Sequence, residues 1–199
     1  MNADLRRSFA EFLVRTPAVK FGDFLLKSGK RSNIFFDFGG IASGEELAGL
    51  GRFFANYIVQ NSLHNCDAIF GPAYKAISIA IATSIALYQD HNRSLPVAFN
   101  RKMEKSYAEG GRFIGCDLTK ARRVLVVDDV ITDGGTKYET IDMLSAFSNL
   151  RITAFVVGVD RQEKDPLGRS WAEIFQEKTG IEVHALTNSE EVLRIGQTT

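Results

Sequence analysis

The 199-residue sequence has few of the residues that mark specialised protein classes. Its two cysteines, Cys66 and Cys116, form no CxxC pair, which excludes a disulfide framework and a cysteine-based zinc site. Only four prolines occur and no repeat or low-complexity tract is present, so we expect no long linker. The most apolar run, residues 76–88, is too short to span a bilayer. Free thiols and the lack of a recognisable targeting segment make the cytoplasm the expected location.

The formal net charge is zero, because 24 lysines and arginines balance 24 aspartates and glutamates. Surfaces that coat nucleic acid are usually basic, so we expect no nucleic-acid partner, and the hydropathy argues against a membrane partner. What remains is an ordinary globular composition, 45% hydrophobic and 24% charged. A chain of this length is expected to form one domain over residues 1–199.

Short apolar runs alternate with helical patterns from Cys66 onward. Strands are expected at 66–70, 97–100, 123–129, 152–160 and 182–186, and helices at 75–88, 136–147 and near 171–178. Before them we expect a helix at 4–14, short strands at 23–26 and 32–37, and a helix that begins at the capping box of Ser43 and Glu46. Residues 101–121 are polar and contain several glycines. This alternation predicts an α/β fold with a parallel sheet covered on both faces, in which ligands bind beyond the carboxyl ends of the strands.

One expected strand ends in two carboxylates, Asp128 and Asp129. Ionised carboxylates are costly to bury unpaired, so both should lie at the sheet edge, facing a cleft. The residues that follow are Val130, Ile131, Thr132, Asp133, Gly134, Gly135 and Thr136. Glycines, hydroxyls and the start of a helix together favour a phosphate site, and nearby carboxylates suit sugar hydroxyls. The segment is neither a Walker loop nor a GxGxxG fingerprint, and a simple capping box of Thr136 and Glu139 is the alternative.

The segment VLVVDDVITDGGT, residues 124–136, resembles the binding signature for 5-phosphoribosyl 1-diphosphate (PRPP) in type I phosphoribosyltransferases. The resemblance implies that Asp128 and Asp129 hold the ribose hydroxyls and that residues 132–136 receive the 5-phosphate, within a PRPP-binding segment of residues 128–136. It also implies the type I phosphoribosyltransferase fold, a central parallel sheet flanked by helices. A small N-terminal hood, mainly residues 20–40, would cover a PRPP-binding core of about residues 64–187.

Four further segments resemble the orotate phosphoribosyltransferase family of bacteria and fungi. They are FLLKSGKRSNIFFDFGG (24–40), FGPAYKAISIA (70–80), FNRKMEKSYAEGG (99–111) and VDRQEK (159–164). The resemblance implies transfer of the phosphoribosyl group of PRPP to orotate, which gives orotidine 5'-monophosphate and pyrophosphate in pyrimidine biosynthesis. It further implies Mg²⁺ bound mainly through PRPP or pyrophosphate, with no metal ligands assigned to the protein. The expected assembly is a homodimer in which the loop at 101–112 reaches the neighbouring active site.

Residue roles follow from the same resemblance together with elementary chemistry. Cations stabilise a diphosphate leaving group, and a guanidinium offers a fork to the carboxylate of orotate. The PRPP-binding set adds Lys27, Tyr74, Lys75, Arg101, Lys102 and Lys105 to residues 128–136, and Lys105, Asp128 and Asp129 are the expected catalytic residues. The orotate-binding set is Lys27, Phe35, Phe36, Thr132 and Arg161. Because successive strand residues face opposite sides, only one phenylalanine of the pair is expected to stack on the base. The alternatives are core packing for the phenylalanines and an ion pair of Arg161 with Asp160 or Glu163.

Some positions depart from the family pattern. Tyr107 stands where the family's loop has a histidine, and tyrosine is a poor proton donor near neutral pH. Asn33 and Ile34 replace a Pro-Tyr pair in the hood. Asp133 places an acid beside the expected phosphate, so its side chain should point away or act through magnesium-bound water. These departures leave two other readings open: a phosphoribosyltransferase for another base, and a non-catalytic PRPP-binding regulator.

Overall fold

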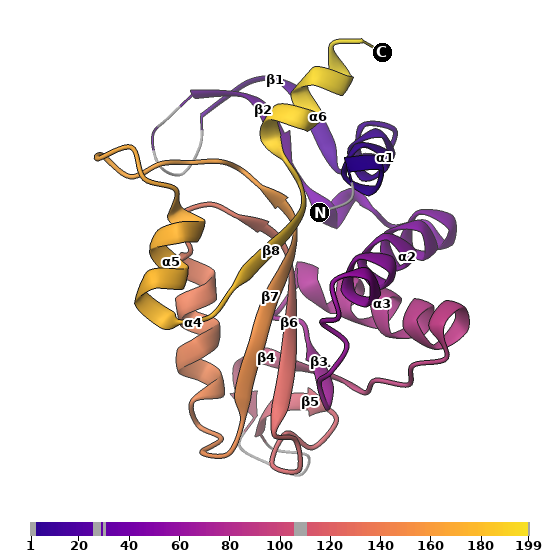
Figure 1. The fold of residues 1–199 in the computed structure, drawn as a ribbon, viewed down its shortest axis with the longest axis vertical. Helices are drawn as coiled ribbons and strands as arrows, with labels where there is room; N and C mark the ends of the chain where they lie inside the picture. Colours follow the sequence, from indigo (N-terminus) through magenta and orange to yellow (C-terminus); the bar gives the residue numbers. More distant parts are fainter. Residues whose placement is uncertain (1–2, 26–28, 30, 106–110, 199) are drawn as a thin grey trace.

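The computed structural model describes residues 3–25, 29, 31–105 and 111–198, without the side chains of residues 103–105. The expected roles of Lys27 and Tyr107, and that of the Lys105 side chain, therefore lie outside the described residues. The chain forms a six-stranded sheet flanked by helices, and a separate two-stranded hairpin (Figure 1).

The six strands lie in the order β5-β4-β3-β6-β7-β8. Their bounds are β3 Ala68–Phe70, β4 Val97–Lys105, β5 Gly111–Gly115, β6 Arg123–Ile131, β7 Arg151–Asp160 and β8 Val183–Asn188. Strands β3, β4, β6, β7 and β8 are parallel, which confirms the predicted α/β class. Strand β5 pairs antiparallel with β4 at the edge of the sheet. This strand was not predicted from the polar segment 101–121. Strand β6 lies between β3 and β7, so its carboxyl end opens at the middle of the sheet.

Helices cover both faces of this sheet (Figure 1). Helices α2 (Gly44–Gln60) and α3 (Lys75–His91) lie on one face, and α4 (Gly135–Leu144) and α5 (Trp171–Thr179) lie on the other. Along β6, Leu125 and Val127 join the core cluster that contains Phe54 of α2. Val124 and Val126 join the opposite cluster with Phe175 of α5. Burial on both faces explains why this strand is a continuous apolar run rather than an alternating one.

The hood expected over residues 20–40 contains the antiparallel strands β1 (Val19–Leu25) and β2 (Arg31–Phe36), followed by a 3₁₀ turn at Phe38–Gly40. Helices α1 (Ala3–Val14) and α6 (Ser189–Gly196) lie at the same end of the molecule (Figure 1). Helix α6 packs tightly on β1, since a Cβ atom on Gly196 would come within 2.1 Å of the Phe21 ring. This helix was not expected, although Asn188 caps it by accepting the N–H of Glu191.

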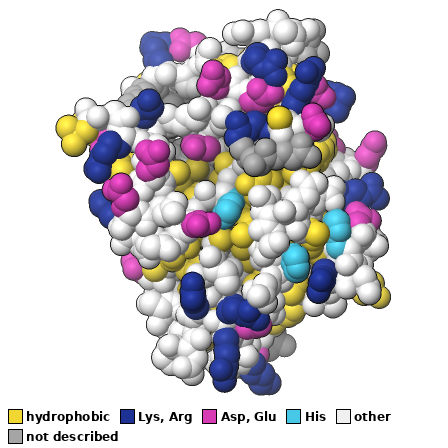
Figure 2. All heavy atoms as spheres, viewed as in Figure 1, with side chains coloured by type: hydrophobic (Ala, Val, Ile, Leu, Met, Phe, Trp, Pro, Cys, Tyr) yellow, Lys and Arg dark blue, Asp and Glu magenta, His cyan; other side chains and the backbone are white. Residues whose placement is uncertain are grey.

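The surface carries both signs of charge. On the face drawn in Figure 2, acidic and basic side chains are mixed around the upper end, and basic side chains gather at the lower end, where β6 begins. None of the described helices is long and apolar enough to cross a membrane.

Candidate active site

The two carboxylates at the carboxyl end of β6 are held by their own strand. The Oδ1 atom of Asp128 accepts the N–H of Asp129 at 2.9 Å, and the Oδ1 atom of Asp129 accepts the N–H of Val130 at 2.8 Å. Both side chains are largely buried. Burial, and then the negative charge of Asp128, raise the pKa of Asp129 against the opposing charges of Lys137 and Lys75. The predicted pair of acids therefore lies side by side at the strand end, with neighbouring cations compensating part of the charge.

The turn after β6 leads directly into α4. Gly134 has φ of 81°, in the left-handed region that favours glycine, and it precedes the first residue of the helix. The carboxylate of Asp133 accepts the N–H of Gly135 at 3.0 Å and the hydroxyl of Thr132 at 3.3 Å. The short side chain of Asp133 thus satisfies a free amide of the helix start, and the expectation that it points away from the phosphate or acts through magnesium-bound water stays a prediction. The turn leads into a helix start, and the Gly135 N–H at that start is bonded to a carboxylate.

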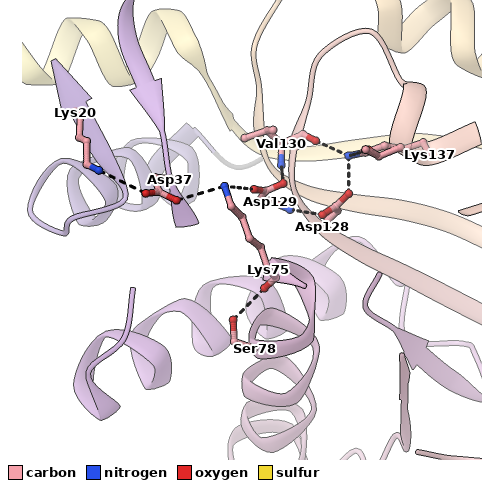
Figure 3. Close-up of polar contacts among 9 residues, drawn as sticks. Lys20, Asp37, Lys75, Ser78, Asp128, Asp129, Val130 and Lys137 are labelled. Carbon is pink, nitrogen blue, oxygen red and sulfur yellow. Dashed lines mark hydrogen bonds and ion pairs between the residues drawn. The ribbon is translucent and has the colours of Figure 1, made fainter. Parts of the chain in front are cut away.

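Lys75, the first residue of α3, connects the sheet to the hood (Figure 3). Its Nζ lies 3.6 Å from Asp129 Oδ2 and 3.3 Å from Asp37 Oδ1. Asp37 follows β2 and also pairs with Lys20 of β1 at 3.4 Å. Burial alone would raise the pKa of Asp37, but the hydrogen bonds and charges of Lys75 and Lys20 outweigh it and lower that pKa. Alternating charges thus run from the hood to the end of β6.

A second lysine, Lys137, approaches the acids from α4 (Figure 3). Its Nζ lies 2.6 Å from Asp128 Oδ2, donates to the carbonyl oxygen of Val130, and is 3.3 Å from Thr136 Oγ1. The side chain is only 2% exposed. The two acids are therefore paired with different lysines, Asp128 with Lys137 and Asp129 with Lys75.

Two of the cations expected to serve the diphosphate, Arg101 and Lys102, lie in β4, past the residues that pair with β3. Lys102 Nζ is 5.1 Å from the centre of the exposed Tyr74 ring, an arrangement suited to a cation–π contact. The peptide between Ala73 and Tyr74 is cis, and the Ala73 N–H donates to Asn100 Oδ1 at 2.8 Å. The Nε atom of Arg101 is buried and has no hydrogen-bond partner within the described part of the chain. The β3–α3 turn, which carries Tyr74, thus contacts the part of β4 that carries Arg101 and Lys102.

The residues assigned to orotate have more varied surroundings. Phe36 belongs to the core, whereas Phe35 is half-buried with its ring 5.6 Å from that of Phe24. The predicted alternation of the pair is confirmed, since Phe36 is buried and Phe35 is only half-buried. The Arg161 guanidinium pairs with Glu163 at 3.4 Å, which is one of the two ion pairs considered from the sequence. The Arg161 N–H donates to the Ile131 carbonyl, which keeps this residue beside the end of β6.

Two site residues, Asp37 and Lys137, were missed in the sequence. Each had a local signal: Asp37 ends a strand, and Lys137 is a cation in the first turn of a helix, where the helix dipole favours anions. Neither signal identifies the partner; Asp37, for example, meets Lys75 of α3 only once the hood is folded over the sheet.

The fold, with its paired acids ahead of a glycine turn, is that of the type I phosphoribosyltransferases. A crystal structure of orotate phosphoribosyltransferase from Francisella tularensis is similar with a TM-score of 0.79 and 36% identity, over 96% of this chain and 91% of that one. Orotate phosphoribosyltransferase of Bifidobacterium longum strain DJO10A is 39% identical over 96% of this chain and 86% of its own. The Chromohalobacter salexigens enzyme of the same name is 42% identical over 94% and 81%. No protein-family model matches the chain. The chain belongs to the orotate phosphoribosyltransferase family.

Proposed function

We propose that this enzyme transfers the phosphoribosyl group of PRPP to orotate, giving orotidine 5'-monophosphate and pyrophosphate in pyrimidine biosynthesis, within a single domain over residues 1–199. The observation that carries the proposal is the pair Asp128 and Asp129 at the end of β6, directly ahead of the turn into α4, in a member of this family. A ring nitrogen of orotate attacks the anomeric carbon as the bond to diphosphate breaks. Positive charge then develops on the ribose and negative charge on the leaving group.

The β6–α4 turn would bind the phosphoribosyl half of PRPP. The carboxylates of Asp128 and Asp129 accept hydrogen bonds from the ribose hydroxyls, and their charge favours the cationic ribose of the transition state. The 5-phosphate lies against residues 130–136, where the amides at the start of α4 favour an anion. This assignment is supported by the left-handed Gly134, which lets the backbone turn closely around a ligand.

The diphosphate half would meet the cations that precede this turn in the chain. Lys75 is supported by its position beside Asp129, and Lys102 by its position over Tyr74. Arg101 has a buried Nε without a partner among the described residues, and an anionic oxygen would satisfy it. Lys105 completes the set from the loop. These cations stabilise the charge that accumulates as pyrophosphate leaves.

The base would lie between the hood and the ends of β6 and β7. Arg161 binds the carboxylate of orotate, exchanging its contact with Glu163 for a bidentate one. Phe35 covers the flat ring from the hood, Thr132 contributes a hydroxyl, and Lys27 is assigned to the base or the diphosphate.

Magnesium is proposed as a part of the substrate. Among the described residues no group of three or more histidine, cysteine, aspartate or glutamate side chains is placed to hold a metal ion. PRPP offers diphosphate and ribose oxygens, the hard ligands that Mg²⁺ prefers. The ion then enters with PRPP and leaves with pyrophosphate.

A homodimer is proposed on the strength of the resemblance and of one surface. Helix α3 exposes Ile81, Ile85 and Tyr88, and a hollow of about 360 Å³ with a largely apolar lining lies between α2 and α3. Covering this face in a dimer would remove apolar side chains from water. In that dimer the 101–112 loop of each subunit reaches the neighbouring site. A cytoplasmic location and the lack of a nucleic-acid partner stay predictions from the sequence.

The assay follows the ultraviolet absorbance of orotate with Mg²⁺, with and without PRPP. A PRPP-dependent decrease and release of pyrophosphate are expected. Asp129→Asn should lower kcat/KM at least about 100-fold, equivalent to about 2.7 kcal/mol of transition-state stabilisation, because it removes charge facing the ribose. Asp142→Asn, an exposed acid on α4, is the matched control and should change it less than about twofold. PRPP binding by calorimetry without orotate turnover would instead favour another base or a regulator.

A further inference from the structure

Lys137 is a buried cation in an unusual place. It stands in the first turn of α4, where the partial positive charge of the helix opposes a second positive charge. Burying an ammonium is also costly unless it is paired and hydrogen-bonded. The pairing is complete here: Lys137 Nζ contacts Asp128 Oδ2, the Val130 carbonyl and Thr136 Oγ1. Residues that oppose such local preferences are found mainly at functional sites, which points to a role of Lys137 beyond the stability of α4.

The contacts of Lys137 make the two acids unequal. Both oxygens of Asp128 are bonded within the protein, Oδ1 to the Asp129 N–H and Oδ2 to the Lys137 ammonium. Asp129 uses Oδ1 for the Val130 N–H, while its Oδ2 has the longer 3.6 Å contact with Lys75. A ligand hydroxyl can therefore replace a weak contact at Asp129, but at Asp128 it must compete with a short charged hydrogen bond.

Lys137 also links the two ends of the turn between β6 and α4. Val130 lies on β6 and Lys137 lies on α4, so their hydrogen bond joins the two ends of the intervening segment 131–136. This bond and the pair with Asp128 together set the position of the helix start relative to the strand end (Figure 3).

We propose that Lys137 is a positioning residue for the phosphoribosyl site: it neutralises and orients Asp128, leaves Asp129 Oδ2 as the more available acceptor for the ribose hydroxyls, and helps to hold the turn that receives the 5-phosphate. The inference rests on the proposed function of this turn. It predicts that the main effect of Lys137 on PRPP binding passes through the charge of Asp128, and that losing the Val130 contact adds less than about threefold. Removing Lys137 alone leaves an unpaired carboxylate facing an anionic substrate, whereas removing both charges does not.

The test is a double-mutant cycle with PRPP binding measured by calorimetry and kinetics by the orotate assay. Lys137→Met should raise the PRPP Kd and KM at least about 10-fold and change the orotate KM less than about twofold. The double variant D128N/K137M should have a PRPP Kd within about threefold of that of the single variant Asp128→Asn. The matched control Lys178→Met, at an exposed lysine of α5, should leave the Kd and the KM for PRPP unchanged.

Thermal melting separates folding from binding in these variants. If Lys137→Met does not fold, the comparison of D128N/K137M with Asp128→Asn decides, since neither of these variants has a carboxylate at position 128. A further 10-fold loss in the double variant, or an unchanged PRPP Kd in a folded Lys137→Met, would overturn the inference. Wild-type protein that binds PRPP but does not consume orotate would overturn only the proposed base, because calorimetry still tests Lys137. Wild-type protein that binds no PRPP would overturn both.

Discussion

Asp133 adds a negative charge where the phosphate of PRPP is proposed to bind. Its carboxylate accepts the Gly135 N–H at the start of α4. Two like charges a few ångströms apart repel by about 1 kcal/mol in water, which corresponds to about a fivefold change in affinity. Asp133→Asn keeps an oxygen that can accept the same N–H but removes the charge. We therefore expect the KM for PRPP to fall about fivefold, most clearly at low ionic strength.

The measurement is the PRPP KM at low and high salt, with Asp142→Asn, an exposed acid on the helix that follows, as the control. A KM that rises in Asp133→Asn would mean that the charge of Asp133 is needed to hold the turn, which contradicts the prediction. A fall that persists unchanged in high salt would argue against an electrostatic cause.

Single residues also show what can be predicted from this sequence. Asp128, Asp129 and the turn at 132–136 carry their signal locally, because a strand, two acids and two glycines are consecutive in the chain. The partners of these acids have no such local signal in the sequence. Lys75 is 54 positions before Asp129, and Asp37 meets Lys75 only after the hood has packed on the sheet. Contacts of this kind depend on tertiary packing, for which a single sequence has no pattern.

The α2–α3 pair shows how one helix sets the position of the site. A Cβ atom on Gly51 of α2 would come within 2.3 Å of the Ala82 carbonyl oxygen of α3, so the two helices pack with their backbones close together. Gly51→Ala must push α3 away, and overpacking of this kind costs about 2 kcal/mol although alanine is the better helix former. Since α3 begins at Lys75, we expect the PRPP KM to rise as well.

Urea denaturation measures the stability loss, and Gly44→Ala is the control. Gly44 begins the same helix, but a Cβ atom added there would meet no neighbouring atom within 4 Å, so this change should leave the midpoint nearly unchanged. Equal midpoints for both variants would show that α2 and α3 separate without cost, contrary to their close packing.

Regular elements were predicted where the chain has a clear period. The strand at 123–129 and the helix after it were expected, and β6 and α4 are found there, with β6 extending to Ile131. Two elements were missed for physical reasons. Strand β5, Gly111–Gly115, lies at a sheet edge in a polar, glycine-containing segment and lacks a buried apolar run. Helix α6 is only eight residues long, so its apolar pattern, with Val192 and Ile195 buried, covers barely two turns before the chain ends its contacts with α1 and the hood.

The site as a whole is formed between two parts of the chain, the hood and the six-stranded sheet, which share one hydrophobic core. The sheet supplies the acids and the turn, and the hood supplies Asp37, which meets Lys75 across the junction (Figure 3). If the 101–112 loop comes from a second subunit, a complete site needs three parts from two chains. Such a site should recover activity when two different inactive subunits are mixed, and a site formed within one chain should not.

Two inactive variants, Lys105→Ala and Asp129→Asn, are mixed after mild dissociation and reassociation. If Lys105 acts on the neighbouring site, each mixed dimer has one site with both native residues and one site with neither. Random mixing makes about half of the dimers mixed, so about a quarter of the native activity should return. If Lys105 acts within its own subunit, every site in a mixed dimer lacks one residue and no activity returns. Mixing Asp129→Asn with a Thr132→Ala variant, two residues of one subunit's turn, is the control that should stay inactive in either case.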